Sequence, residues 1–425
     1  MDNPKEILLK TFGYHEFRDD QKEIIDTIIS GADALVLMPT GSGKSICYQL
    51  ACILKPGISF VVAPIRALML DQTEDLKSAF FDRVSFINSD LTPQQKTETL
   101  DNFQSGKYFF ILISPERFQN LQFRESFISV VNKFQISYAV VDEVHCLSEW
   151  GHDFRLSYLS LAKTIRDLSH TKHKIIFLGL TATASTKVIK DIQVEFDLSD
   201  DNIVTPSSFT RPELNFDIVN DKGSKKNELI KKLKYLIDKH DILTLKDSET
   251  KAGIIFTQNV GGVNGCYSIS QDLIKTLNQD VRYYSGTKPK KLDIKLKQFN
   301  LYKKQALLDF KKNIFSLIVA TKSFGMGVNK PNIHFTIHYG IPCSMEALYQ
   351  EGGRAGRDKV IFNKANPAKC ITLLSESNIE DEDNLWGSEL SVDDFIDKET
   401  SGDLETNLYL MKMGLENDST ATNEE

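Results

Sequence analysis

Short apolar, β-rich runs recur between residues 1 and 375 of this chain and alternate with longer helix-like stretches. The runs lie at residues 34–38, 58–63, 109–114, 138–141, 175–179, 253–257, 317–320 and 334–338. Strands that alternate with helices favour parallel sheets, because each connection between parallel strands crosses the sheet and carries a helix onto one of its faces. The pattern therefore predicts an α/β fold with parallel sheets covered by helices on both faces.

The strand-like runs fall into two groups, separated by a stretch rich in proline, asparagine and glycine between Ser207 and Gly223. A chain of 425 residues is also long enough for two or three compact units. We therefore expect a first domain at 1–206, a linker at 207–225, a second domain at 226–375 and an acidic end at 376–425. The acidic end is expected to be partly disordered, with a short helix near Leu404 to Met413.

The net charge of −7 is unevenly distributed. The segment 376–425 holds sixteen acidic and two basic side chains, a net charge of −14. The body of the chain, 1–375, holds 49 basic and 42 acidic side chains, a net charge of +7. The body is therefore compatible with binding phosphates, and the acidic end is typical of an interaction segment.

Hydrophobic residues make up 41% of the chain and charged residues 26%, which is ordinary globular composition. No apolar run is long enough to span a membrane, and the polar N-terminus does not resemble a signal peptide. The six cysteines show no paired spacing, so neither a disulfide framework nor a zinc site is predicted. We expect a soluble, intracellular protein.

A buried-strand pattern, Leu35 to Met38, runs directly into a glycine-rich loop and then into a helix-compatible stretch. The loop residues are Pro39, Thr40, Gly41, Ser42, Gly43, Lys44 and Ser45. Glycines let backbone N–H groups close around phosphates, Lys44 reaches the phosphates, and the Ser45 hydroxyl can bind Mg²⁺. Met38 replaces the usual first glycine, so a chance Gly-Lys-Ser turn remains an alternative.

Further along the chain, the run Tyr138 to Val141 ends in Asp142 and Glu143. A carboxylate at a strand's carboxyl end beside a phosphate loop is placed to hold Mg²⁺, and a second carboxylate can orient the attacking water. We assign these roles to Asp142 and Glu143 respectively. The alternative is an acidic turn that merely ends a strand.

The segment Gln350 to Asp358 contains Arg354 and Arg357 and lies on the second domain. Two arginines at this spacing fit one helical face or turn, and either can reach a phosphate held by the first domain. Gln350, Arg354 and Arg357 are therefore candidate catalytic residues, and a solvated Arg-Gly turn is the alternative.

Aromatic and cationic side chains gather immediately after the two carboxylates, at His145, Trp150, His152, Phe154 and Arg155. Exposed aromatic rings stack on bases with about 1 to 3 kcal/mol each and demand no particular sequence. This segment is the candidate nucleic-acid loop, although Trp150 and Phe154 also fit core packing.

Taken together, these motifs resemble the RecQ helicases of superfamily two over about residues 7–375. The resemblance runs in order through Phe12-Gly13-Tyr14 with Phe17, Arg18 and Gln21; Met38 to Ser45; Ala63 to Leu68; Ile113 to Arg117; Asp142 to His145 with Trp150 to Arg155; Gly179 to Thr183; Ser208 to Pro212; Ile254 to Phe256; Ala320 to Pro331; and Gln350 to Asp358.

The resemblance implies two tandem RecA-like domains with ATP in the cleft between them. It further implies that Tyr14, Arg18 and Gln21 contact adenine, and that Trp150, Phe154 and Arg155 couple base stacking to hydrolysis. Thr181 and Thr183 match the segment that links the ATP state to nucleic-acid contacts, and Arg66 and Lys330 match positions that contact the nucleic-acid backbone. For Tyr14, Arg18 and Gln21, a helix cap and core contact remain the alternative.

The chain also departs from the family pattern. RecQ enzymes usually continue into a zinc-binding module with four cysteines and a winged helix, whereas here only Cys370 follows Cys343 before the acidic end begins. Gly353 stands in place of the usual threonine, and the Asp142 to His145 box reads DEVH rather than DEAH. Lys288 to Lys312 contains nine lysines, which fit either a DNA track or, more simply, an amphipathic helix with a solvated basic face.

Two functions fit this sequence. The first is an ATP- and Mg²⁺-dependent DNA helicase of RecQ type that moves on single-stranded or forked DNA, 3′ to 5′ by family resemblance, with RNA not excluded. The second is an ATP-gated binding or assembly subunit whose acidic end docks a protein partner and which does not unwind duplexes alone.

Overall fold

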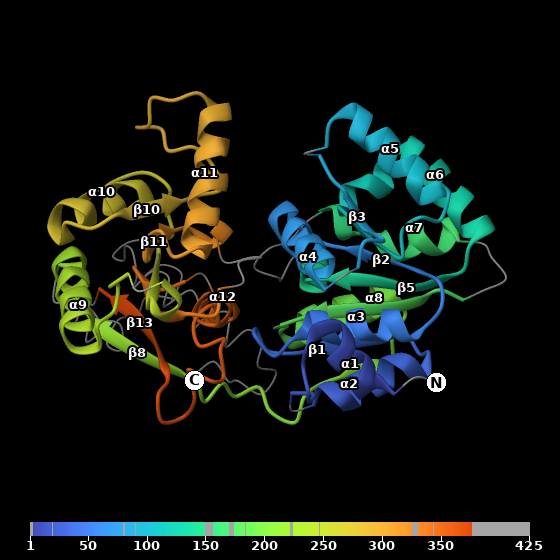
Figure 1. Cartoon of the computed structure of the whole chain (residues 1–425), viewed down its shortest axis with the longest axis horizontal. Coiled ribbons are helices and arrows are strands. Elements are labelled where there is room, and N and C mark those ends of the chain that lie inside the picture. The colour runs from blue at the N-terminus through green and yellow to red at the C-terminus, as the bar shows by residue number, and fades with distance from the viewer. Residues whose placement is uncertain are drawn as a thin grey trace, which may run out of the picture. The chain divides into compact units, whose positions relative to one another are not determined.

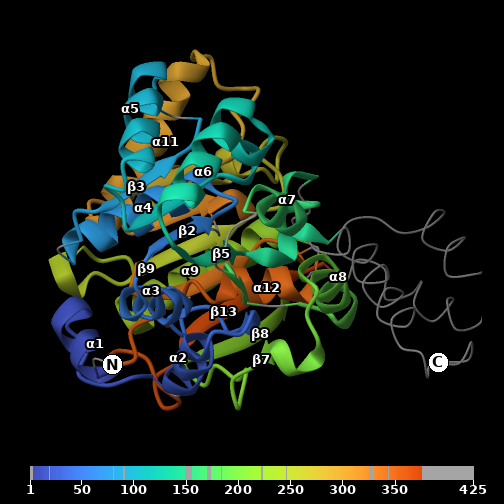
Figure 2. The same ribbon diagram turned by 90° about the vertical axis from the view of Figure 1, so that its right-hand side faces the viewer.

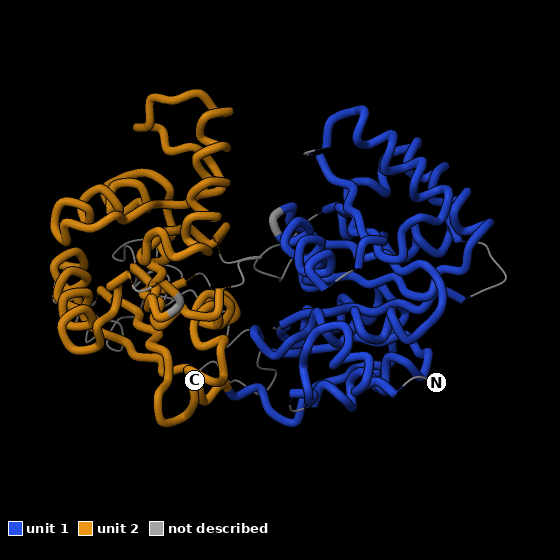
Figure 3. Tube along the Cα trace, viewed as in Figure 1, with its two compact units in different colours: residues 1–210, 326–328 blue, residues 211–325, 329–425 orange. Residues whose placement is uncertain are grey.

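A computed structural model describes residues 3–18, 20–79, 81–89, 91–148, 156–169, 174–182, 184–221, 224–245, 247–324, 330–342 and 344–375. The chain divides into two compact units, and the division falls between Thr210 and Arg211 (Figure 3). Within the described part of the chain, no helix has both the length and the apolar character needed to cross a membrane.

The first unit is built on a seven-stranded sheet in which every neighbouring pair is parallel. Its spatial order is β3-β4-β2-β5-β6-β1-β7. The strands are β1 (Ala34–Leu37), β2 (Ile58–Val62), β3 (Val84–Ile87), β4 (Phe110–Ile113), β5 (Ile136–Asp142), β6 (Ile176–Thr181) and β7 (Ile203–Val204). The central strands are buried on both faces, which explains their continuous apolar runs.

Helices cover both faces of this first sheet (Figures 1 and 2). One apolar layer joins the sheet to α1 (Pro4–Phe12), α2 (Gln21–Ser30), α3 (Lys44–Leu54) and α4 (Arg66–Ser78). The opposite layer joins it to α5 (Pro93–Gln104), α6 (Leu121–Lys133), α7 (Leu161–Leu168) and α8 (Thr186–Phe196). Because all strands are parallel, their carboxyl ends lie along the same edge of the sheet, where ligands bind in folds of this class.

The second unit is built on a six-stranded sheet, also parallel throughout, with the order β10-β11-β9-β12-β13-β8. The strands are β8 (Leu214–Asn220), β9 (Ala252–Phe256), β10 (Val281–Tyr284), β11 (Leu317–Ala320), β12 (Ile333–His338) and β13 (Ala368–Leu374). The helices are α9 (Lys225–His240), α10 (Cys266–Leu277), α11 (Leu296–Lys311) and α12 (Met345–Gly352). Residues of α9, α10 and α11 share one apolar layer with the sheet.

The sequence-based linker at 207–225 is corrected by the structure. The second unit begins at Arg211, and β8 forms the edge of its sheet by pairing with β13 along its whole length. Strand β8 alternates apolar and polar side chains and is flanked by Pro212 and by Asp221, so the breakers around it hid a short amphipathic strand. All eight predicted runs are strands, whereas β3, β7, β8, β10 and β13 were missed.

Candidate functional site

The glycine-rich loop between β1 and α3 has the backbone of a phosphate-binding loop. Gly41 and Gly43 take positive φ angles of 81° and 91°, which side chains with a Cβ rarely adopt. A Cβ at Gly43 would also lie 2.3 Å from Gln21 Nε2. Helix α3 begins at Lys44, so its first N–H groups and the positive end of its dipole face the loop.

Lys44 is the cation of this loop. Its ammonium nitrogen is buried, lies 3.6 Å from Glu143 Oε1, and has no hydrogen-bond partner among the described residues. A buried ammonium without a hydrogen-bond partner raises the free energy of the folded chain, and a ligand that supplies an acceptor removes this cost. Lys44 together with the loop N–H groups therefore fits the phosphates of a nucleotide, and its role in phosphate binding stays a prediction.

Asp142 and Glu143 lie at the carboxyl end of β5, beside the loop. Burial, followed by the neighbouring charge of Glu143, raises the pKa of Asp142 to about 6, and Lys44 opposes this shift. Glu143 adopts a left-handed backbone with φ 49°, directly after the strand. The buried carboxylate of Asp142 and the partly buried carboxylate of Glu143 fit a divalent cation, which would relieve their repulsion.

Gln72 on α4 contacts this carboxylate pair and was not foreseen from the sequence. Its Nε2 donates to Asp142 Oδ2 at 3.1 Å, and its Oε1 accepts from the Tyr48 hydroxyl at 2.9 Å. Tyr48 belongs to α3, so the amide connects the helix of the phosphate loop to the candidate metal ligand. Gln72 is 4% exposed, as a core residue would be. A polar side chain in such a buried position needs hydrogen-bond partners, and this is the feature that indicates a role in positioning Asp142.

His145 is buried and does not lie on the surface of the unit. Its Nδ1 is 2.8 Å from Thr181 Oγ1 and 3.4 Å from Glu143 Oε2. The imidazole therefore bridges the candidate water-orienting carboxylate and the carboxyl end of β6. This geometry is consistent with coupling through Thr181, but it excludes an exposed, base-stacking His145 in this structure.

Arg18 and Gln21 approach the phosphate loop from the start of α2. Arg18 Nη1 donates to the Gly41 carbonyl at 3.0 Å, and Gln21 Nε2 donates to the Ser42 carbonyl at 2.9 Å. Gln21 Oε1 in turn accepts from the Arg18 N–H at 2.8 Å. Tyr14, by contrast, is about half exposed. Contact with adenine stays a prediction for all three residues.

In the second unit, helix α12 carries Gln350 and ends just before Arg354 and Arg357. Gln350 and Arg354 are both 7% exposed. Burial and the nearby charges of Arg354 and Arg211 lower the pKa of Arg357 well below its usual value. Arg211 itself pairs with Glu213 and donates to the Gly356 carbonyl at 3.2 Å. Three guanidinium groups thus gather in one partly buried place, which fits an anion.

Arg66 and Lys330, the two candidate backbone contacts, differ in exposure. Arg66 is exposed at the first residue of α4. Lys330 is only 1% exposed, donates to Asn313 Oδ1, and lies 5.0 Å from the centre of the Phe310 ring. Burial lowers its pKa to about 8. The buried position argues against a direct phosphate contact by Lys330, whereas Arg66 is accessible.

Several predicted residues lie outside the described part of the chain: Trp150, His152, Phe154, Arg155, Thr183 and the acidic end 376–425. Their assigned roles stay predictions. Among the described residues, no three His, Cys, Asp or Glu side chains cluster in a way that would hold a metal without further ligands.

Comparison with known families identifies two successive matches. Residues 18–192 match the DEAD/DEAH box helicase family, and residues 228–359 match the helicase conserved C-terminal domain. The chain is 32% identical over 374 residues to the ATP-dependent DNA helicase RecQ of Bacillus subtilis, covering 88% of this chain and 56% of that protein. It is 30% identical over 376 residues to the probable ATP-dependent DNA helicase RecS of the same organism, covering 88% and 68%.

Solved structures add a likeness of fold. The DEAD-box helicase Mss116 bound to ssRNA and UDP-BeF matches with a TM-score of 0.65 and 16% identity, over 93% of this chain and 82% of that one. The two parallel-sheet units therefore have the tandem RecA-like fold of helicases. The chain spans only about half the length of the RecQ relatives it matches.

Proposed function

Because the chain belongs to the RecQ family of DNA helicases, we propose that it is an ATP-dependent motor that moves on single-stranded DNA and unwinds duplexes, with 3′ to 5′ polarity. The observation that carries the proposal is the buried Lys44 ammonium beside Asp142 and Glu143. No other described group of the first unit combines a phosphate loop with two carboxylates at a strand end.

We assign the steps of hydrolysis as follows. Lys44 and the loop N–H groups bind the phosphates, and nucleotide phosphates compete with Glu143 for the Lys44 ammonium. Asp142 and Ser45 would hold Mg²⁺, which would neutralise charge at the phosphates when bound. Glu143 orients the attacking water and accepts its proton. Gln350, Arg354 and Arg357 of the second unit stabilise the charge that develops on the transferred phosphoryl group.

The energy of hydrolysis reaches the nucleic acid through residues that touch the carboxylates. His145 connects Glu143 to Thr181, and Gln72 connects Asp142 to α4, whose first residue is the exposed Arg66. The aromatic residues Trp150 and Phe154, which follow in sequence, would stack on bases.

A measurement of ATP hydrolysis with and without single-stranded DNA tests this proposal. We expect DNA to raise turnover, and Lys44→Ala to reduce the stimulated rate by roughly 10³-fold or more, because the mutation removes a charge that acts on the developing phosphate charge. Turnover that is indifferent to DNA and RNA, or a Lys44→Ala variant that retains its rate, would reject the proposal.

The acidic residues 376–425 motivate a second function, that of an ATP-gated subunit which captures a protein partner and does not unwind alone. A duplex-displacement assay on the isolated chain separates the two functions. Displacement with ATP favours the helicase, whereas stimulated hydrolysis without displacement favours the assembly subunit.

A further inference from the structure

The second unit carries an exposed basic projection that the proposed motor does not use. We call residues 286–312 the basic arm; it comprises the loop after β10 together with α11. The arm holds nine lysines against two aspartates, a net charge of +7. Figure 1 shows α11 and the preceding loop standing out from the sheet of this unit.

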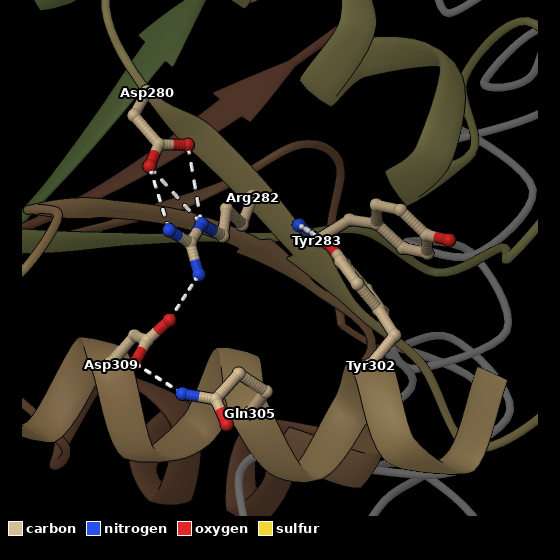
Figure 4. Close-up of polar contacts among 6 residues, drawn as sticks. All are labelled: Asp280, Arg282, Tyr283, Tyr302, Gln305 and Asp309. Carbon is tan, nitrogen blue, oxygen red and sulfur yellow. Dashed lines mark hydrogen bonds and ion pairs between the residues drawn. The ribbon is translucent and has the colours of Figure 1, made fainter. Parts of the chain in front are cut away.

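The inner face of the arm is fixed to β10 by polar contacts (Figure 4). Arg282 donates to Asp280 at 3.0 Å and to Asp309 of α11 at 2.5 Å, and the Tyr283 N–H donates to the Tyr302 hydroxyl at 3.2 Å. The side chains buried on the same side of α11 are Phe299, Ala306 and Phe310. The orientation of α11 about its axis is therefore set by its inner face.

The loop of the arm is also held in place. Lys303 donates to the Gly286 carbonyl at 3.3 Å, and its ammonium lies 5.2 Å from the centre of the Phe299 ring. Lys288 donates to the Leu292 carbonyl at 2.7 Å. These two lysines have structural partners, so the remaining lysines are presented from an ordered scaffold.

The outer face of α11 combines positive charge with apolar surface. Leu301 is 63% exposed and Leu308 is 40% exposed. The residues that share this face follow the spacing i, i+4, i+7, i+11: Lys297, Leu301, Lys304 and Leu308. Four lysines of the arm form no ion pair with any described carboxylate: Lys290, Lys291, Lys297 and Lys304. The face thus lacks both a counter-charge and an apolar cover within the described part of the unit.

Helix α9 of the same unit provides a contrast. It is also rich in lysine, but Lys226 pairs with Asp272 at 2.5 Å and Lys231 pairs with Glu228 at 3.3 Å. Its lysines are therefore partly neutralised within the unit. A phosphate backbone would need the lysines of the arm but not its exposed leucines, so the arm fits a ligand that is both acidic and apolar.

We propose that the acidic residues 376–425 of this same chain dock on the outer face of the basic arm. This segment has a net charge of −14, opposite to the +7 of the arm. Its apolar residues Leu404, Leu408, Met411 and Leu415 repeat the spacing i, i+4, i+7, i+11, which a helix would bring to one face. The acidic segment and the outer face of α11 therefore carry opposite charges, and each has apolar side chains that could pack against those of the other.

The tether allows this contact. The stretch 376–403 separates Leu404 from Ser375, where the described chain ends next to the second sheet. A random coil of that length would span about 30 Å on average and up to about 95 Å when extended. A unit of this size is roughly 40 Å across, so the stretch is long enough to reach any part of its surface. The inference does not rest on the proposed helicase activity.

Carbodiimide coupling of the full chain, which joins lysine ammonium groups to carboxylates, tests the proposal by mass spectrometry of the cross-linked peptides. We expect cross-links from 376–425 to Lys290, Lys291, Lys297 and Lys304, and few to Lys231 and Lys234 of α9. The double variant Leu301→Gln/Leu308→Gln keeps every lysine, and its cross-link yield should fall by roughly tenfold because apolar contact is lost. The matched variant Lys231→Gln/Lys234→Gln should leave the yield unchanged.

Other occupants of the arm give distinct results, each of which overturns the proposal. Cross-links that appear only between isotopically different copies would assign the face to a second copy of the chain, and cross-links to carboxylates of the first unit would assign it to that unit. Weaker single-stranded DNA binding by Lys297→Gln/Lys304→Gln, with no cross-links to 376–425, would assign it to nucleic acid. Equal cross-linking of α9 and the arm would reduce the contact to nonspecific attraction.

Discussion

The two units bury charge of opposite sign. In the first unit, Asp142 and Glu143 share the single ammonium of Lys44, and the pKa of Asp142 is raised because burial and a like charge penalise its ionised form. In the second unit, Arg354 and Arg211 surround Arg357, whose pKa is lowered for the corresponding reasons. Each unit therefore places like charges close together, with Lys44 beside the carboxylates and Glu213 paired with Arg211.

This difference indicates what each unit requires from a ligand. Clustered like charges in a low-dielectric setting destabilise the fold that contains them, so such clusters persist mainly where a ligand supplies the opposite charge. The carboxylates of the first unit call for a cation, and the arginines of the second unit call for an anion.

The largest effect is expected from removing the positive charge of the second unit. Arg357→Ala should lower the DNA-stimulated turnover number by roughly 10³ to 10⁵-fold, because an arginine that stabilises transferred phosphoryl charge is worth that much. Binding of a nonhydrolysable ATP analogue should change far less. Steady-state hydrolysis and analogue titration measure the two quantities.

Arg282 provides the matched control for Arg357, because it is an arginine of the same unit with its charge balanced by Asp280 and Asp309. Arg282→Gln should lower thermal stability and leave turnover nearly unchanged. Arg357→Ala should instead lower turnover strongly. If Arg357→Ala kept turnover within a few-fold of the unsubstituted chain, the assigned role would be wrong.

A smaller effect is expected when the support of the first unit's carboxylates is removed. Gln72→Leu deletes the hydrogen bond that orients Asp142 while preserving an apolar body of similar size. The Mg²⁺ concentration for half-maximal hydrolysis should rise by roughly 10 to 100-fold, as is typical when a partner of a metal ligand is lost. A Mg²⁺ titration of ATPase activity measures this change.

Tyr48→Phe is the graded control for Gln72→Leu. It removes only the hydroxyl that holds the Gln72 amide and leaves the bond to Asp142 in place. Its Mg²⁺ requirement should therefore rise less than that of Gln72→Leu. An unchanged requirement in both variants would mean that Gln72 only packs in the core.

Sequence reasoning found those parts of the fold and the site that depend on neighbouring residues. The phosphate loop was recognisable because Gly41, Gly43 and Lys44 act through local backbone geometry, and Asp142 was recognisable because it directly follows a buried apolar run. The buried central strands were visible for the same reason, since both of their faces are apolar.

Features that depend on long-range pairing were not visible in the sequence. Strand β8 exists because it pairs with β13, which lies at the far end of the second unit's sequence, and its alternating pattern between breakers resembles a loop. The burial of His145 and Lys330 and the bond from Gln72 to Asp142 likewise depend on elements that are distant in sequence. Gln72 stands in the polar run Asp71 to Asp75 of α4, so the sequence offered no signal that distinguishes it from its neighbours.

The smallest predicted effect concerns stability, and it follows from the raised pKa of Asp142. In the unfolded chain this carboxyl titrates near 3.8, whereas in the folded chain its pKa is about 6. Ionisation of Asp142 therefore costs folding free energy, and the cost grows as pH rises from about 3 to about 7 and is nearly constant above that range. Asp142→Asn should stabilise the ligand-free fold at pH 7 by about 3 kcal/mol, as measured by denaturant unfolding.

The pH dependence of the stability difference separates the effect of removing the Asp142 charge from a change in side-chain packing. The advantage of Asp142→Asn should vanish near pH 2, where the carboxyl is protonated in both states, and the exposed control Asp101→Asn should change stability little. ATP with Mg²⁺ should reverse the ranking, because these ligands stabilise the chain that binds them and Asp142→Asn lacks the metal carboxylate. If Asp142→Asn were less stable than the unsubstituted chain at pH 7 without ligand, the ionised carboxylate of Asp142 would be stabilised by neighbouring groups of the first unit. The proposed contrast in charge between the two units would then be wrong for the first unit.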